Sequence, residues 1–144
     1  MSFWDSSAVV PLCIREERTD NLKVLQESDQ RLTVWWGTTV ECTSAFARRR
    51  REDRRWASEE RSALERLGLL AEMWTEVGPT RPLRHLAIRL VRVHALRAGD
   101  AFQLAAALES VSGNPMGLGL VTLDWRLAEA ARLEGFSVLP EGVS

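Results

Sequence analysis

The stretch LGLVTLDWRLAEAARLEGFSVL, residues 118–139, identifies the fold class of this chain. Its opening, Leu118–Leu123, is an apolar run typical of a buried strand. Asp124–Glu134 then has the apolar spacing of a helix, and Gly135 ends it. Phe136–Leu139 is expected to be the last strand. A strand, a helix and a second strand in so short a span are typical of parallel strands joined by a helix.

The same alternation continues outward through the rest of the chain. Three further strands are expected, at Met1–Trp4, Arg31–Trp36 and Met73–Val77. Six further helices are expected: Ala8 to about Ile14 (capped by Ser6 or Ser7), Asp20–Glu27, Thr38 to about Arg55, a helix capped by Ser58, a helix that begins near Pro82, and Asp100–Val111. These elements predict an α/β fold, in which a single-domain parallel β-sheet is sandwiched by α-helices and the crossovers are right-handed.

Length and composition are those of one soluble domain. The chain has 144 residues, of which 45% are apolar, and we expect a single domain over residues 1–144. No apolar run reaches the roughly 18 residues that span a membrane, and Asp5 and Arg15 interrupt any leader-like start. Cys13 and Cys42 lack metal-type spacing, so buried thiols in a cytoplasmic protein are expected. The net charge of −1 excludes a strong general attraction to nucleic acid.

Four acidic residues point to chemistry. Asp5, Glu41 and Asp124 each lie where a strand-like run gives way to a helix-like run, and Asp100 opens a helix-like run of its own. In a parallel sheet these points gather outside the carboxyl ends of the strands. Two carboxylates about 4 Å apart repel by roughly 4 kcal/mol at an effective dielectric of about 20, so the cluster must hold protons or a cation. Oxygen ligands of this kind suit Mg²⁺ or Mn²⁺.

Each acid also has a purely structural interpretation. Asp124 is a suitable helix cap, and Asp100 is favourable at the positive end of its helix. Glu41 completes a capping box that begins at Thr38, and Asp5 suits a turn. The coincidence favours a site, because three of the six aspartates occupy these positions and one carboxylate can both cap a helix and bind a metal.

The sequence around these acids resembles a known family. FWDSSA, residues 3–8, resembles the opening motif of PIN-domain nucleases, especially the VapC-type toxins of prokaryotic toxin–antitoxin pairs. TVE, residues 39–41, is similar to the second motif, and LRAGDA, residues 96–101, to the third. VTLD, residues 121–124, resembles the closing motif. Each motif alone is weak, but the four occur in order with the acids at matching positions, and the likeness extends from Phe3 to Leu139.

The resemblance implies a PIN-like domain that acts as a Mg²⁺- or Mn²⁺-dependent endoribonuclease with one or two metal ions. Asp5, Asp100 and Asp124 are then the expected metal ligands, and Glu41 a further ligand or the group that orients the attacking water. Ser6 and Thr122 are expected to hydrogen-bond that water or the phosphate. The resemblance also implies an RNA substrate, a 5′-phosphate and a 3′-hydroxyl on the products, a cognate antitoxin and a homodimer. Gly99 departs from the family pattern, in which a larger residue is common before the third acid.

Basic and aromatic residues have two interpretations. The arginines at positions 48–51, 54 and 55 form either a phosphate contact or a solvated helix face, and the solvated face is favoured. Arg15 and Arg126 are closer in sequence to the acids and are better candidates for positioning phosphate. Most of the six tryptophans are expected in the core, with Trp35 and Trp36 on opposite faces of one strand, while Trp125 is a candidate for substrate contact. The two histidines, His85 and His94, have no partner at zinc spacing.

Two other functions are compatible with the same acids. A phosphoacceptor signalling domain also gathers aspartates around Mg²⁺, but it needs a lysine near a late strand, and the only lysine here is Lys23. A non-catalytic PIN-like interaction module would keep the fold without the activity, and the four intact acids count against it.

Overall fold

A single five-stranded parallel sheet forms the centre of the molecule in the computed structural model, which describes residues 2–29 and 31–143. The strands are β1 (Phe3–Trp4), β2 (Thr33–Trp35), β3 (Thr75–Val77), β4 (Gly119–Val121) and β5 (Ser137–Leu139). They lie in the order β3-β2-β1-β4-β5, and every neighbouring pair is parallel. The predicted α/β class is confirmed.

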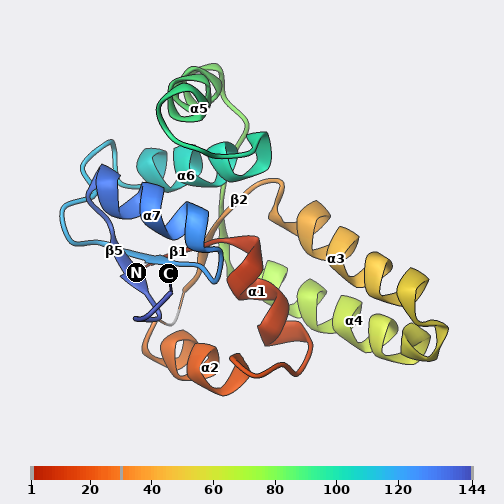
Figure 1. Cartoon of the computed structure of the whole chain (residues 1–144). Coiled ribbons are helices and arrows are strands. Elements are labelled where there is room, and N and C mark those ends of the chain that lie inside the picture. Colours follow the sequence, from red (N-terminus) through yellow and green to blue (C-terminus); the bar gives the residue numbers. More distant parts are fainter. Residues whose placement is uncertain (1, 30, 144) are drawn as a thin grey trace.

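Helices cover both faces of this sheet (Figure 1). They are α1 (Ser6–Cys13), α2 (Thr19–Ser28), α3 (Thr38–Glu52), the short 3₁₀ helix η1 (Arg54–Trp56), α4 (Ala57–Met73), α5 (Arg81–Val93), α6 (Ala98–Ser110) and α7 (Trp125–Glu134). Buried side chains of α1, α2, α3 and α4 form one apolar core, and those of α5, α6 and α7 form the other. Helices α3 and α4 pack as a pair that extends away from the sheet.

Alternation along the strands supplies both cores. Trp4 and Val121 belong to the core under α1–α4, whereas their neighbours Phe3 and Leu120 belong to the core under α5–α7. Successive strand side chains point to opposite faces, so a strand that is covered on both faces places apolar residues next to one another. Trp36 was expected to complete this pattern and does not. It follows the end of β2 and its side chain is 56% exposed.

The predicted helix caps are wrong at three positions. The cap of α1 is Asp5, whose side chain accepts the Ser7 backbone N–H at 3.3 Å, so Ser6 and Ser7 lie inside the helix. Helix α3 begins at Thr38 after Gly37 and has no side-chain cap, so the capping box does not form. Ser58 likewise lies in the first turn of α4, which η1 precedes. In each case the chain enters the helix one or two residues earlier than the capping signal suggested.

The order of the strands creates a ligand-binding crevice. From β1 the chain moves outward to β2 and β3, then returns to place β4 on the other side of β1. Ligand sites of open parallel sheets lie outside the carboxyl ends of the strands, at this point of reversal. Asp5 follows β1 and Asp124 follows β4 after a short loop, so both lie at the crevice.

Among the described residues, no helix combines the length and the apolar character that a membrane crossing requires.

Candidate functional site

One cavity of about 480 Å³ lies at the carboxyl ends of β1 and β4, and all four predicted acids line it. Asp5 comes from the end of β1, Glu41 from the first turn of α3, Asp100 from the first turn of α6, and Asp124 from the cap of α7. The structure therefore brings together residues that are up to 119 positions apart in sequence. We call this space the acidic cavity.

The two carboxylate oxygens of Asp5 differ in their hydrogen bonding. Its side chain is 2% exposed. The Oδ2 atom accepts hydrogen bonds from the Ser7 hydroxyl at 2.5 Å and the Thr122 hydroxyl at 2.8 Å, besides the Ser7 backbone N–H. Among the described residues, the Oδ1 atom receives only a long contact of 3.4 Å from the Ser6 hydroxyl. The carboxylate is thus oriented by its neighbours while one oxygen stays available to a ligand.

Glu41 is positioned by a residue that sequence reasoning missed. The amide nitrogen of Gln103 on α6 donates to Glu41 Oε1 at 2.7 Å and to Thr38 Oγ1 at 3.2 Å. Gln103 is completely buried. The other Glu41 oxygen, Oε2, is 3.4 Å from the Ser6 hydroxyl. A signal for this pairing exists in the sequence, since Gln103 lies three positions after Asp100 and so on the same face of α6.

Asp124 and Asp100 complete the site from two helix starts. Asp124 Oδ1 accepts the backbone N–H groups of Arg126 at 2.9 Å and Leu127 at 3.0 Å, which is the capping role anticipated for it. Its Oδ2 has no hydrogen-bond partner among the described residues, so capping leaves one oxygen for the cavity. Asp100 lies in the first turn of α6, where Gly99 precedes it. A Cβ atom at Gly99 would meet Glu41 Oε2 at an ordinary 3.7 Å, so the larger residue that is common in the family would also have room for its Cβ at this position.

The surroundings of the acids favour their protonated forms. Burial raises the pKa of Asp5, and repulsion from Asp124 adds to this, although the hydrogen bonds from Ser7 and Thr122 oppose it. Burial, with the charges of Asp5 and Asp100 nearby, raises the pKa of Glu41 to about 7. Burial and the charges of Asp124 and Asp5 raise the pKa of Asp100 to about 6. The cluster therefore carries unfavourable negative charge that a proton or a cation would relieve.

The donor set of the acidic cavity fits a hard divalent cation. Four carboxylates line it, and Asp5 Oδ1 and Asp124 Oδ2 are largely unengaged. Mg²⁺ prefers such oxygen donors together with several waters, for which a cavity of this size has room. As the side chains stand, no group of three histidine, cysteine or acidic residues in the described ranges forms a ready coordination shell.

Ser6 and Thr122 take different places. Ser6 lines the acidic cavity, and its hydroxyl lies between Asp5 and Glu41. Thr122 is completely buried behind Asp5, where its hydroxyl contacts Asp5 Oδ2 and accepts the backbone N–H of Asp124 at 3.0 Å. Ser7 was expected only as a helix cap, but its hydroxyl also contacts Asp5 Oδ2 and accepts the Leu123 backbone N–H at 2.9 Å. These contacts tie the end of β1 to the end of β4.

Of the basic residues considered, Arg48 is the one that lines the acidic cavity. Most of its neighbours on α3 and η1 are paired with acids outside the cavity: Arg49 with Glu16, Arg50 with Glu60, and Arg55 with Asp53. These ion pairs favour the solvated-face interpretation for Arg49, Arg50 and Arg55, and a phosphate-facing role is open to Arg48.

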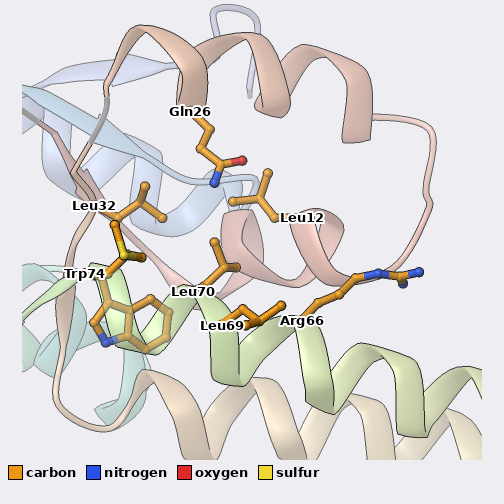
Figure 2. Close-up of a pocket in the computed structure, with 8 residues that line it drawn as sticks. Leu12, Gln26, Leu32, Arg66, Leu69, Leu70 and Trp74 are labelled. Atoms are coloured by element: carbon orange, nitrogen blue, oxygen red, sulfur yellow. The ribbon is translucent and has the colours of Figure 1, made fainter.

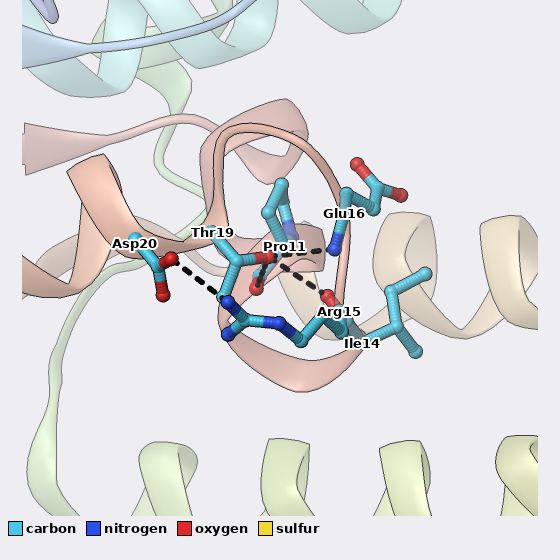
Figure 3. Close-up of polar contacts among 6 residues, drawn as sticks. All are labelled: Pro11, Ile14, Arg15, Glu16, Thr19 and Asp20. Atoms are coloured by element: carbon cyan, nitrogen blue, oxygen red, sulfur yellow. Dashed lines mark hydrogen bonds and ion pairs between the residues drawn. The ribbon is translucent and has the colours of Figure 1, made fainter.

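Arg15 is not placed to position phosphate. Helix α1 carries the chain about 12 Å from Asp5, at 1.5 Å per residue. At that far end Arg15 pairs with Asp20 at 2.8 Å, as Figure 3 shows. Arg126, the other candidate, is exposed and lies over the Trp125 ring at 5.3 Å, outside the acidic cavity.

The remaining aromatic and histidine predictions hold in part. Trp4 and Trp35 are buried as expected, while Trp36 and Trp125 are exposed. Trp125 borders a different cavity from the acids. His94 Nε2, just after α5, lies 2.7 Å from Oε2 of Glu134, the last residue of α7, which is a structural contact.

A second cavity, of about 420 Å³, is separate from the acids. It lies between α1, α2 and α4 and is drawn in Figure 2, where Leu12, Leu32, Leu70 and Trp74 surround it. Its lining is mostly apolar and contains no acidic residue, so it lacks the means for metal or acid–base chemistry.

Comparisons with known proteins bear on this arrangement through the fold. No family model and no curated protein sequence matches the chain. Solved structures do match. PAE2754 from Pyrobaculum aerophilum is 21% identical, with a TM-score of 0.67 over 96% of this chain and 88% of its own.

Two further solved structures share the arrangement. VapC20 from Mycobacterium tuberculosis, a sarcin–ricin-loop-cleaving toxin, is 17% identical, with a TM-score of 0.67 over 90% of this chain and 95% of its own. FitAB bound to an IR36 DNA fragment is 15% identical, with a TM-score of 0.61 over 96% of this chain and 94% of the matched chain. At these identities the likeness establishes the fold, and the predicted PIN-like α/β fold is confirmed.

Proposed function

We propose that this protein is a Mg²⁺- or Mn²⁺-dependent endoribonuclease that acts as the toxin of a toxin–antitoxin pair. The observation that carries the proposal is the convergence of Asp5, Glu41, Asp100 and Asp124 on one cavity at the reversal point of the sheet. The fold that carries this cavity is shared with a sarcin–ricin-loop-cleaving toxin, which supports RNA as the substrate.

Three of the carboxylates would bind the cation, and the fourth would accept a proton. Asp5, Asp100 and Asp124 would hold the cation, since Asp5 and Asp124 each keep one oxygen toward the cavity and Asp100 lines it beside them. When bound, the cation neutralises charge on the phosphate oxygens and lowers the pKa of a nucleophilic water.

Glu41 would accept the proton of the attacking water. A general base works best when its pKa lies near the working pH, and in the metal-free protein burial, with the charges of Asp5 and Asp100 nearby, raises the pKa of Glu41 to about 7. Its Oε1 is held by Gln103, while Oε2 has only the long contact to Ser6 within the described ranges and can receive the proton. Arg48, at the same cavity, would contact a phosphate of the RNA.

The partners follow from the same proposal. FitAB and VapC toxins support a cognate antitoxin as the regulator of the site. We also propose a homodimer and a cytoplasmic location, as the resemblance to VapC-type toxins implies.

The test is cleavage of a mixed RNA pool by purified protein, with Mg²⁺ or Mn²⁺ and with EDTA. Asp5→Asn and Asp100→Asn each remove one charge from the cavity. Asp20→Asn is the matched control, because Asp20 pairs with Arg15 on the surface. We expect metal-dependent cutting that leaves 5′-phosphates, is lost in both cavity variants and is kept in the control. Cutting that survives EDTA and both substitutions would overturn the proposal.

The two alternative functions fit the structure less well. The lysine that a phosphoacceptor domain requires is absent from the acidic cavity, because Lys23 lies on α2. A non-catalytic module has no need for four acids of which some have a raised pKa and others keep a carboxylate oxygen without a strong hydrogen bond. A Mg²⁺ titration that shows no binding would favour that module over the nuclease.

A further inference from the structure

A third cavity, of about 440 Å³, lies on the other side of α6 from the acids. It is enclosed by the end of β2, the loop before α5 and the first turns of α5 and α6. Phe102 and Trp35 line it, and Phe102 is only two positions after Asp100. Residues two apart on a helix point in nearly opposite directions, so the start of α6 separates this cavity from the acidic one. We call it the aromatic cavity.

Its aromatic side chains are arranged as a platform. Trp35 and Phe102 are stacked, with ring centroids 5.4 Å apart and an angle of 3° between their planes. Trp36 is not part of the cavity lining but lies beside it, where it meets Trp35 edge-on with centroids 6.3 Å apart and is more than half exposed. Trp35 is largely buried and backs the ring of Phe102, which is half-buried, so the accessible rings are those of Phe102 and Trp36. Accessible aromatic rings are the usual stacking surface for unpaired nucleobases, each worth a measurable part of the binding energy. The volume also lies in the range of cavities that take small planar ligands.

Two arginines at the rim of the aromatic cavity occupy positions that do not stabilise the fold. Arg81 and Arg84 both line it and both lie in the first turn of α5, which contains no acidic residue. Cations near the positive end of a helix are unfavourable, by about 0.3–1 kcal/mol each. Among the described residues neither guanidinium forms an ion pair. Their charge therefore suits an anion from outside, such as a phosphate.

We infer that the aromatic cavity binds an unpaired base of a single-stranded RNA whose scissile phosphate lies at the acidic cavity. Phe102, backed by the buried Trp35, supplies the stacking surface together with the exposed ring of Trp36 beside the cavity, and Arg81 and Arg84 contact the flanking phosphates. A base must leave its helix to reach such a pocket, so the site selects single-stranded or looped RNA over duplex RNA. This inference rests on the proposed function, although the binding it describes does not require cleavage.

The experiment measures binding apart from catalysis. A fluorescein-labelled oligouridylate is titrated with the full chain carrying Asp5→Asn and Asp100→Asn, without metal, and anisotropy is recorded at several salt concentrations. Phe102→Leu is added to remove the ring while keeping the apolar volume. Arg81→Gln with Arg84→Gln removes two charges whose loss favours the helix, so this variant is expected to fold. Arg92→Gln, at the opposite end of α5, is the matched control.

We expect Phe102→Leu to weaken binding at least about fivefold. The double arginine variant should lower the slope of log affinity against log salt by about 1.4, at about 0.7 for each phosphate contact to a single strand. The control should bind as the parent does, and duplex RNA of the same length should bind more weakly than the single strand.

Three results would overturn the inference. The first is unchanged affinity and salt slope in both cavity variants. The second is equal binding of duplex RNA. The third is a dimer that Phe102→Leu converts to a monomer with unaltered RNA affinity, measured by light scattering, which would assign the cavity to a contact between two copies. Absence of cleavage by the wild-type protein, with RNA binding intact in this assay, would count against the nuclease alone, because the binding assay does not depend on cleavage.

Discussion

At the scale of single residues, neighbours decide what each carboxylate can do. Asp5 is oriented by Ser7 and Thr122 through Oδ2, and Asp124 is oriented by the backbone of α7 through Oδ1. Glu41 instead depends on Gln103 and on the charges around it. The carboxylates of Asp5 and Asp124 are therefore fixed in place by hydrogen bonds, whereas the carboxylate of Glu41 is the one whose pKa is raised to about 7.

Metal-free protein should lose stability as the pH rises through the range in which Glu41 ionises. The pKa of Glu41 is raised by burial from 4.5 to about 7, so between these values the folded state holds a proton that the unfolded state has lost. Asp100, with a pKa raised to about 6, acts in the same direction. Below about pH 4.5 the Glu41 carboxyl is protonated in both states and its effect vanishes.

Glu41→Gln should remove this penalty. We expect the variant to be more stable than wild type at pH 8, by on the order of 1–2 kcal/mol after allowance for solvent screening, and nearly equal at pH 4.5. Urea unfolding in EDTA at the two pH values measures the difference. Glu52→Gln, an exposed change on the same helix, is the control. A gain in stability that is the same at both pH values would contradict the explanation.

Gln103→Leu should move the acid limb of the cleavage–pH profile upward by about 1–2 pH units. The variant deletes a hydrogen bond to the ionised form of Glu41, an interaction of about 1.5–3 kcal/mol. Thr38→Val is the control, because it removes the other partner of the Gln103 amide and keeps the bond to Glu41. Cleavage rates from pH 6 to pH 9 decide the matter, and an equal loss at every pH would show that Gln103 acts only on folding.

At the scale of elements, the connection from α1 to α2 is held by one buried hydroxyl. Thr19 Oγ1 donates to the carbonyl of Pro11 at 2.8 Å and accepts the backbone N–H of Glu16 at 2.8 Å, as Figure 3 shows. This contact closes the turn that packs α2 beside α1. Because Asp5 caps α1, the connection also supports the helix that follows the first acid.

Thr19→Val should destabilise the protein by about 2 kcal/mol. Valine has the same shape, but it leaves the Pro11 carbonyl and the Glu16 N–H without their partner, at about 1–3 kcal/mol for a buried group. Thr43→Val is the matched control, since the Thr43 hydroxyl is exposed and contacts only the Thr39 carbonyl of its own helix. The midpoint of urea unfolding is the measurement. Equal shifts of the unfolding midpoint in the two variants would mean that the buried Thr19 hydroxyl contributes no more to stability than the exposed Thr43 hydroxyl.

At the scale of the whole molecule, the strand order brings the two halves of the chain to one edge. Asp5 and Glu41 come from the first half, and Asp100 and Asp124 from the second. Since β1 and β4 are neighbours, any ligand shared by these acids links the halves. Binding at the cavity should therefore stabilise the entire fold and not only one segment.

Mn²⁺ should raise the thermal unfolding midpoint at pH 8. At a concentration about 100 times its Kd, a ligand of the folded state adds about 2.7 kcal/mol, which corresponds to roughly 5–10 °C for a chain of this size. We expect Asp5→Asn to abolish the shift and Asp20→Asn to retain it, measured by differential scanning fluorimetry. A shift of the same size in Asp5→Asn would show that the metal binds elsewhere.

Much of this protein follows from local patterns in its sequence. The strand–helix alternation in residues 118–139 and its repetition upstream predicted the parallel sheet, because apolar periodicity depends on near neighbours alone. The four acids were found for the same reason, since strand ends in such a sheet share one edge. The caps were predicted less well, because several side chains can satisfy the same helix start and tertiary contacts choose among them.

Contacts between distant segments required the folded chain. Gln103 meets Glu41 across 62 positions, Phe102 stacks on Trp35, and Arg48 reaches the acidic cavity where Arg15 does not. Each of these depends on how two helices or a helix and a strand pack, and that packing is decided by the shapes of whole surfaces. The sequence thus specified the order of the elements and the acids at their ends, through periodicity and chain direction. The tertiary structure alone decided which side chains hold, surround and extend the site, because those pairings arise only when distant surfaces are brought into contact.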